Sequence, residues 1–179
     1  MASCCTNLQL KNCSPVDSPK VFAIDPHVPN LLFFPKQLQL KGFAPFEDGR
    51  LIAQDKASCL PAYVLLGGLA DTLQTDLEVV DATAAPGNKT THLSALLSTS
   101  GRITALERDK FRFRTLQKMV SQAGCKNVKT IKTDFLSIPP DDEAYSKVSH
   151  ILLDPSCCEN PLPSSTTIIT DPVSYLFLV

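Results

Sequence analysis

Asp154 and Cys157 place a carboxylate and a thiol three residues apart, directly after the mainly apolar run Val148 to Leu153. A carboxylate at the end of such a run can accept hydrogen bonds from the edge of a nucleobase. A deprotonated thiol close by can act as a nucleophile or as a general acid and base. A buried structural cysteine beside a proline turn has the same spacing, so both interpretations stay open.

A second group of residues lies in the segment Asp81 to Thr90, which reads Asp-Ala-Thr-Ala-Ala-Pro-Gly-Asn-Lys-Thr. Its three alanines and Gly87 would let the backbone approach a flat ligand and the amino-acid tail of that ligand. Asn88 can cap the following helix, whose free N–H groups would then face a carboxylate. A tight strand-to-helix turn without a ligand is the competing interpretation. The segment matches neither the glycine pattern of a phosphate loop nor that of a dinucleotide loop.

Two further acids end runs of the same kind. Glu107 lies about 20 residues beyond the glycine loop, the position from which an acid reaches the hydroxyls of a ribose. Asp134, after a third run, would lie beside an adenine ring in the same geometry, and a helix cap or turn aspartate is its competing interpretation. The default interpretation of the following basic run is a solvated helix face, and the alternative is contact with phosphates: Arg108, Lys110, Arg112, Arg114 and Lys118.

Alternating strands and helices would bring these residues together. In one predicted helix Leu93, Leu96 and Leu97 share a face, and in the other Leu116 and Val120 do. Strand, helix, strand, helix at this spacing predicts a parallel sheet with right-handed crossovers, and ligands bind such sheets beyond the carboxyl ends of the strands. The predicted fold is therefore a Rossmann-like α/β domain. The predicted strands are 77–81, 102–107, 127–131 and 148–154, and the predicted helices are 51–69, interrupted by Pro61, 88–97 and 109–123, with Gly124 as its stop.

Composition sets limits on the class of protein. The 179 residues are 44% hydrophobic and 20% charged, which is typical of one globular domain. The formal net charge of −1 means that a nucleic-acid partner would have to meet a local basic face. The seven cysteines are odd in number and show no Cys-x-x-Cys, so we expect reduced thiols in an intracellular protein, with no disulfide framework and no zinc site. No stretch approaches the roughly 20 apolar residues of a membrane span.

Together, several stretches between Phe22 and Cys157 resemble the NOL1/NOP2/Sun family of RNA cytosine-C5 methyltransferases, in the branch that acts on large-subunit ribosomal RNA. This resemblance implies an S-adenosylmethionine-dependent methyltransferase with that cofactor and ribosomal RNA as partner. It also implies residence in the nucleus or nucleolus, a monomer, and neither metal nor membrane. The stretches that carry it are Gln54–Pro61, Asp81–Thr90, Ala105–Glu107, Thr133–Leu136 and Ile151–Cys157.

The resemblance also implies a role for each candidate residue. The segment Thr83 to Lys89 would line the methionine and ribose parts of the cofactor, Glu107 would bind the ribose hydroxyls, and Asp134 would approach the adenine. Asp154 would face both the cofactor and the target cytosine, and Cys157 matches the family cysteine that helps to eliminate the C5 proton. The implied cofactor contacts are Thr83, Ala84, Ala85, Pro86, Gly87, Asn88, Lys89, Glu107, Arg112, Asp134 and Asp154, and the implied catalytic residues are Cys157 and Asp154.

The sequence departs from the family after Cys157, where Cys158-Glu-Asn-Pro replaces Ser-Gly-Ser-Gly. The Thr-Cys pair that holds the family's nucleophile is absent from the sequence. We therefore expect a truncated copy whose turnover is doubtful, in four parts: a flexible leader (1–20), an extended lead-in (21–50), a partial methyltransferase domain (51–157) and a divergent tail (158–179). A non-catalytic cofactor-binding or RNA-associated module and an unstable fragment are the alternatives. The apolar run 173–179 is an edge-pairing liability unless it is buried.

Overall fold

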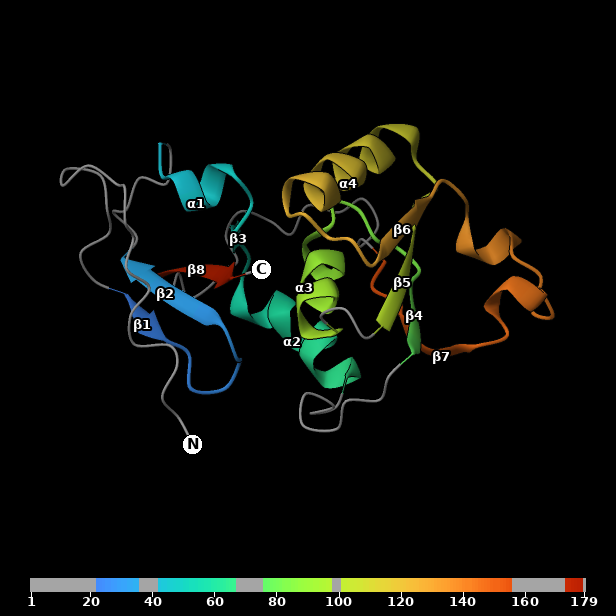
Figure 1. Ribbon diagram of the computed structural model, residues 1–179, viewed down its shortest axis with the longest axis horizontal. Coiled ribbons are helices and arrows are strands. Elements are labelled where there is room, and N and C mark those ends of the chain that lie inside the picture. The colour runs from blue at the N-terminus through green and yellow to red at the C-terminus, as the bar shows by residue number, and fades with distance from the viewer. Residues whose placement is uncertain (1–21, 36–41, 67–75, 98–100, 156–172, 179) are drawn as a thin grey trace, which may run out of the picture.

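The computed structural model describes residues 22–35, 42–66, 76–97 and 101–155, and the backbone of 173–178. The described strands form two sheets, which Figure 1 shows at opposite ends of the molecule with helices between them. One sheet is antiparallel, with its strands in the order β1 (Ala23–Ile24), β2 (Leu31–Pro35), β8 (Val173–Leu178) and β3 (Leu51–Ala53). The other is parallel, in the order β6 (Val128–Ile131), β5 (Gly101–Leu106), β4 (Leu77–Asp81) and β7 (Val148–Leu152).

The parallel sheet confirms the predicted Rossmann-like α/β fold. Its faces are covered unequally by the described residues. Val79 and Ile103 pack with the buried leucines of α3 (Asn88–Leu97) and with α2 (Lys56–Leu65), while α4 (Lys110–Gln122) packs against Ala105 on the same face. On the opposite face, Val80 and Leu106 pack against side chains of the segment that holds the 3-10 helices η2 (Phe135–Ser137) and η3 (Glu143–Tyr145).

The helices α3 and α4 lie close to where the sequence predicts them. The helix α3 spans the predicted 88–97, and Leu93 and Leu97 are buried. The helix α4 begins after Asp109, whose carboxylate accepts hydrogen bonds from two backbone N–H groups of the first turn, and Gly124 follows its last turn. Two of the predicted strands end earlier than expected: β5 ends at Leu106 and β7 at Leu152. Glu107 and Asp154 therefore lie in the loops just beyond their strands.

The predicted helix over 51–69 is wrong in its first part. Leu51–Ala53 is the strand β3, paired antiparallel with β8, and the helix α2 begins only at Lys56. The apolar residues of this segment serve two partners, because Leu51 and Ile52 lie in a sheet while Cys59 and Ala62 lie on a helix face. Pro61 lies inside α2 without ending it. Residues 67–69, the last part of the predicted helix, lie outside the described part of the chain.

The predicted extended lead-in contains more regular structure than expected. Its strands β1 and β2 pair with each other, and a four-residue helix, α1 (Ala44–Glu47), follows. The run 173–178, expected to seek a strand partner, is β8, and it pairs with β2 on one edge and β3 on the other. None of the helices described has the length and apolar character needed to span a bilayer.

The antiparallel sheet and the parallel sheet are joined by one close backbone approach and by hydrogen bonds from the side-chain amides of Gln122 and Asn88 to backbone carbonyls. Gly49 has φ +81°, and a Cβ added there would lie 2.6 Å from the carbonyl oxygen of Gln122 at the end of α4. The Gln122 amide donates a hydrogen bond of 2.5 Å to the Glu47 carbonyl. On the other side of the junction, the Asn88 amide donates to the carbonyl of Ala53, at the end of β3. These contacts fix the segment before α2 against the helices of the parallel sheet.

Candidate functional site

The loop after β4 lies across the carboxyl ends of the two strands that flank β4, namely β5 and β7. The Ala82 N–H donates to the Leu152 carbonyl of β7, and the Ala84 N–H donates to the Leu106 carbonyl of β5, each at 2.9 Å. Ala82, Ala84 and Ala85 are all buried. Because larger side chains would not fit under a loop held this closely, the alanines let the backbone itself form the edge of the site.

Glu107 lies directly beside this loop and is only 5% exposed. One carboxylate oxygen, Oε1, accepts the N–H of Asp109 at 2.8 Å, and the other, Oε2, lies 3.8 Å from Nε of Arg112. The Arg112 Nη2 donates at 2.7 Å to the Ala85 carbonyl. Arg112 thus ties the loop to Glu107, and the structure brings together three residues that the sequence assigned to one site.

A carboxylate that the sequence analysis did not single out lies beneath the loop. Asp81 is 2% exposed, and its Oδ2 accepts a hydrogen bond of 2.7 Å from the Thr90 hydroxyl of α3. Burial raises the pKa of Asp81 to about 6, although hydrogen bonds from Thr90 and from the Thr83 backbone and the charge of Lys89 lower it. The available signal was an aspartate ending the short β-branched strand 77–81, followed nine residues later by a threonine.

Asp154 closes the other side of the loop. Its carboxylate lies 2.7 Å from Nζ of Lys89, and its backbone N–H donates to the Thr83 hydroxyl at 3.1 Å. The Asp154 side chain is half exposed, so this ion pair lies at the mouth of the site rather than in the core. The candidate catalytic residue Cys157 lies outside the described residues.

Asp134 is placed as its competing interpretation predicts. It caps η2, because its Oδ1 accepts the Leu136 N–H at 3.0 Å. Its Oδ2 lies 3.6 Å from Nη1 of Arg108, an arginine at the start of the α4 region. The backbone also connects the two loops, since the Thr133 N–H donates to the Glu107 carbonyl. Asp134 therefore lies next to Glu107 along the strand ends, with one carboxylate oxygen engaged in a cap.

Two details of the loop differ from expectation. Asn88 does not cap α3; it is the first helical residue, and its side chain bonds the Ala53 carbonyl instead. Gly87 has φ +118°, and a Cβ added there would meet Leu116 and Met119 of α4 at 3.3 Å. Both the backbone conformation and the packing against α4 therefore favour glycine at this position.

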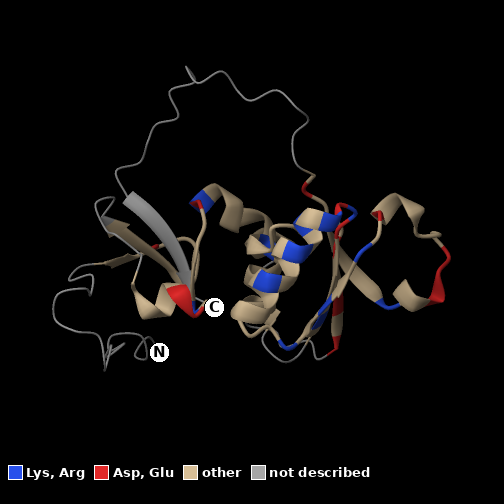
Figure 2. Ribbon diagram, turned by 90° about the horizontal axis from the view of Figure 1, so that it is seen from above, with Lys and Arg blue, Asp and Glu red and all other residues tan. Residues whose placement is uncertain are grey.

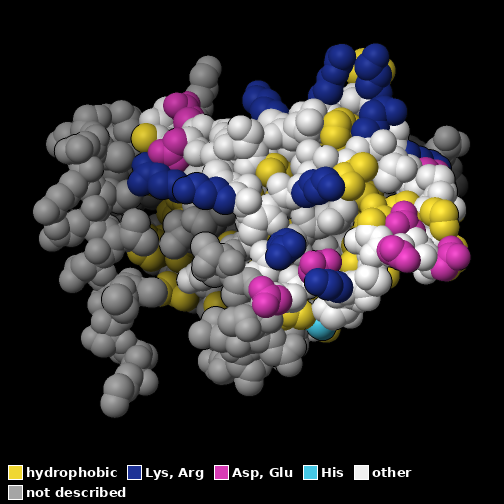
Figure 3. Space-filling model, turned by 45° about the vertical axis from the view of Figure 1, so that its right-hand side comes forward, with side chains coloured by type: hydrophobic (Ala, Val, Ile, Leu, Met, Phe, Trp, Pro, Cys, Tyr) yellow, Lys and Arg dark blue, Asp and Glu magenta, His cyan; other side chains and the backbone are white. Residues whose placement is uncertain are grey.

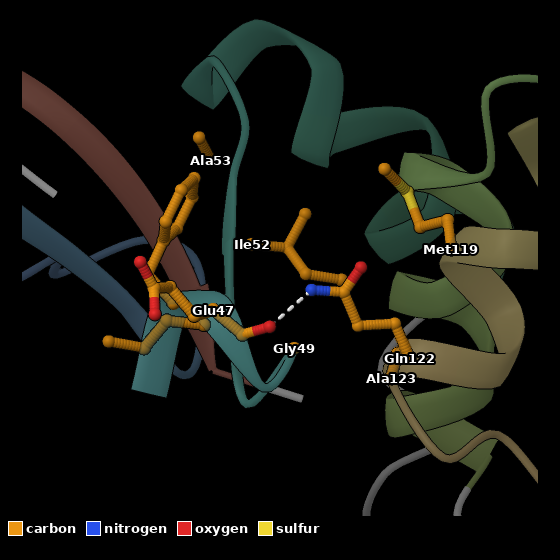
Figure 4. A pocket seen from close by; sticks show the side chains of 9 residues that line it. Glu47, Gly49, Ile52, Ala53, Met119, Gln122 and Ala123 are labelled. Carbon is orange, nitrogen blue, oxygen red and sulfur yellow. Dashed lines mark hydrogen bonds between the residues drawn. The ribbon is translucent and has the colours of Figure 1, made fainter. Parts of the chain in front are cut away.

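Met119 also borders a pocket of about 440 Å³ between the end of α4 and the segment of α1 and β3. Figure 4 shows this pocket between the segment that carries Glu47 and Ile52 and the helix that carries Met119 and Gln122, with the Gln122–Glu47 hydrogen bond across it. Its lining is mainly apolar. The pocket marks the junction of the two sheets and is distinct from the loop–Glu107 edge.

Two cysteines lie within the described residues, and both are free thiols. Burial raises the pKa of Cys59 to about 11 and also raises that of Cys125. Such thiols stay protonated near neutral pH and act as packing groups. Among the residues whose placement the structure gives, no three His, Cys, Asp or Glu side chains gather to hold a metal ion.

Comparison with known proteins gives this arrangement a family. The profile of a family described as 16S rRNA methyltransferase RsmB/F matches residues 70–167, which is more than half of the chain and includes the loop, Glu107, Asp134 and Asp154. The chain belongs to this family. Membership confirms the resemblance to RNA cytosine-C5 methyltransferases that the loop and the Asp-Pro-Ser-Cys stretch predicted.

Individual relatives agree with this assignment. A 28S rRNA (cytosine-C(5))-methyltransferase of Mus musculus is 43% identical over 136 residues, covering 76% of this chain and 28% of the mouse protein. The 25S rRNA (cytosine-C(5))-methyltransferase rcm1 of Schizosaccharomyces pombe is 44% identical over 139 residues, covering 78% of this chain and 29% of the yeast protein. The chain thus spans less than a third of the length of these curated relatives.

Solved structures also match the family fold. The crystal structure of PH0851 is similar with a TM-score of 0.55 at 31% identity, over 66% of this chain and 26% of that one. The crystal structure of NSun6 from Pyrococcus horikoshii with SFG gives a TM-score of 0.50 at 30% identity, over 66% and 29% of the two chains. These similarities support the predicted α/β methyltransferase fold.

Proposed function

We propose that this chain binds S-adenosylmethionine at the carboxyl ends of β4 and β5 and supplies the cofactor-binding part of an RNA cytosine-C5 methyltransferase. The observation that carries the proposal is the loop Ala82–Gly87, held by backbone hydrogen bonds across the ends of β5 and β7 and tied by Arg112 to the buried Glu107. Rossmann-like sheets bind their ligands at this edge. SFG, with which the NSun6 structure was determined, is an analogue of this cofactor.

The residues fit the parts of such a cofactor. Glu107 offers the acceptor that ribose hydroxyls require, beside a loop of small residues that a flat adenosine can approach. The N-terminus of α3, following Gly87, suits the carboxylate of the methionine tail, because its free N–H groups and helix dipole favour an anion. The loop residues Thr83 to Lys89 would line the tail, Arg112 would hold Glu107 and the loop in register, and Asp134 would approach the adenine.

Methyl transfer needs groups that act on the cytosine. When bound, the cofactor supplies an electrophilic methyl group. From this chain, Asp154 would face the target cytosine, and its contacts with Lys89 and with the Thr83 hydroxyl at the mouth of the site support this role. Cys157, three residues further on, is proposed to assist removal of the C5 proton. The Thr-Cys pair that would carry the attacking thiol is absent from these 179 residues, so we expect binding of the cofactor without turnover by this polypeptide.

The target is proposed to be ribosomal RNA of the large subunit. The mouse and fission yeast relatives carry names that specify 28S and 25S rRNA. Ribosomal RNA of this kind is modified where ribosomes are assembled, so we also propose the nucleolus as the site of action. A cytosine within a duplex would have to leave the base stack to reach Asp154.

Calorimetric titration of the full 179-residue chain with S-adenosylmethionine tests the proposal. We expect one site, and we expect Glu107→Gln to weaken binding about tenfold or more, because an amide is a poorer acceptor than a carboxylate for ribose hydroxyls. Glu143→Gln, an exposed acid at η3, is the matched control and should bind as wild type. Absence of binding by the folded wild type, or equal affinity in Glu107→Gln, contradicts the assignment.

Transfer is measured separately, with tritiated cofactor and ribosomal RNA. We expect binding without label in the RNA. Label incorporated by this polypeptide would show that another residue serves as the attacking nucleophile and would contradict the expected lack of turnover.

A further inference from the structure

Positive charge is concentrated in one part of this chain. The whole protein has a formal net charge of −1, yet residues 108–132 contain eight Lys or Arg residues and a single acid, Asp109. This segment comprises the turn before α4, the helix itself and the strand β6. A surface of this charge attracts polyanions even though the protein as a whole does not.

On α4 the charges form a row along the exposed side. Lys110, Arg114 and Lys118 are exposed and follow one another at intervals of four residues, which places them on one helix face about 6 Å apart along the axis. Leu116 and Val120 are buried on the opposite side. No ion pair within the described part of the chain engages any of the three, whereas Arg112 contacts Glu107 and belongs to the cofactor edge.

An aromatic ring lies within this row. Phe111 is 73% exposed, although Phe113 on the same helix packs against the core. This exposed aromatic ring is available to a partner that presents a flat face. Figure 3 shows Lys and Arg side chains gathered over α4 with hydrophobic atoms between them, and Figure 2 shows the Lys and Arg positions along the length of the helix.

We infer that Lys110, Phe111, Arg114 and Lys118, called here the α4 face, bind single-stranded RNA. The cations would contact backbone phosphates, and Phe111 would stack on an unpaired base. Cations combined with an exposed ring are the features by which proteins hold single strands without reading sequence. A shallow groove of about 470 Å³ borders the C-terminal half of the row, with Gln117, Ser121 and Lys126 among its lining, and offers a continuation for the strand.

The inference rests on the proposed action on RNA, but not on the cofactor site. The α4 face lies on the side of the helix away from Leu116, whose side chain faces Gly87 and the loop. Loss of RNA binding should therefore leave cofactor binding intact. The two proposals can fail separately.

The test uses a fluorescein-labelled 12-nucleotide oligouridylate and the full chain, with fluorescence anisotropy at several salt concentrations. We expect Phe111→Ala to weaken binding about tenfold with an unchanged salt slope, because stacking is not ionic. The triple variant K110A/R114A/K118A should weaken binding more strongly and reduce the slope of log affinity against log salt by about 2, since each phosphate contact contributes about 0.7.

Two controls separate this face from general charge and apolar effects. Leu136→Ala removes another exposed apolar side chain, and R50A/R102A/K147A removes three exposed cations from other elements. Both should bind oligouridylate nearly as wild type. Equal losses in the two triple variants, or wild-type affinity in Phe111→Ala, overturn the inference. Polyglutamate that binds as tightly as the RNA would also overturn it, in favour of an acidic protein as occupant. Circular dichroism and calorimetric titration with S-adenosylmethionine should be unchanged in the α4-face variants.

Discussion

Replacing Asp81 with asparagine tests the burial of the carboxylate beneath the loop Ala82–Gly87. Burial raises the pKa of Asp81 from 3.8 to about 6 in the folded protein. The stability due to its protonated form is therefore fully present below pH 3.8 and is lost as the pH rises through about 6. Asparagine keeps an acceptor for the Thr90 hydroxyl but does not ionise, so the variant lacks this loss.

The expected size follows from the shift. Because the pKa is raised to this extent, the free energy of unfolding of the wild type should fall by about 2 kcal/mol relative to that of Asp81→Asn between pH 4.5 and pH 7.5. Urea unfolding of both proteins, followed by circular dichroism at several pH values, measures the difference directly, and all other titrating groups cancel in it. Asp141→Asn, at an exposed position, is the matched control. A flat difference for Asp81→Asn would falsify the buried placement of this carboxylate.

Three further predictions concern the loop and the core. Gly87→Ala should lower the free energy of unfolding by about 1–3 kcal/mol in thermal melts, because φ +118° and the contacts with α4 disfavour a side chain; an unchanged melting temperature contradicts this. Arg112→Ala should weaken S-adenosylmethionine binding about tenfold in calorimetry, by freeing the loop from Glu107 and removing about 1.4 kcal/mol of binding free energy; wild-type affinity would show that the link is dispensable. Burial lowers the pKa of His92 to about 4, so stability is lost as the pH falls through 6.5 toward 4. The free energy of unfolding of His92→Leu, measured with urea, should therefore rise by about 2 kcal/mol relative to that of the wild type between pH 7 and pH 4.5. Equal acid sensitivity of the two proteins would contradict the lowered pKa of His92.

The parallel half of the fold was predictable because its signals are local. The helix α4 is indicated by a capping aspartate at Asp109, an apolar stripe and a glycine after its last turn, all close together in the sequence. The helix α3 follows from the spacing of Leu93 and Leu97. Alternation of such helices with short apolar strands restricts the sheet to a parallel arrangement. The position of the loop beside Glu107 follows from that arrangement alone.

The antiparallel sheet was not predictable in the same way. The strand β3 has three residues, and its partner β8 lies more than a hundred residues further along the chain. Three residues are too few to show the alternation of apolar and polar side chains by which a strand is recognised. Such a strand forms because it pairs with its neighbour, and the local sequence does not show this pairing. An apolar run followed by helix-forming residues therefore looked like one helix from Leu51 onward.

Side-chain detail at the site was predictable only in part. The residue types of the loop indicated that the backbone lies close to other groups. They did not show that α4, which is distant in sequence, leaves no room for a side chain at Gly87. The same holds for Asp81, whose burial follows from tertiary packing. The bond from Arg112 to the Ala85 carbonyl joins two elements 27 residues apart, which spacing alone does not reveal.

The central claim is that one edge of the parallel sheet, between the loop Ala82–Gly87 and Glu107, holds the adenosyl cofactor. A crystal structure of the chain grown with S-adenosylhomocysteine tests it most directly. The account predicts ligand density at the carboxyl ends of β4 and β5, with the ribose hydroxyls within hydrogen-bond distance of the Glu107 carboxylate. Density at another place, such as the pocket beside Met119, with an empty loop edge, would contradict it.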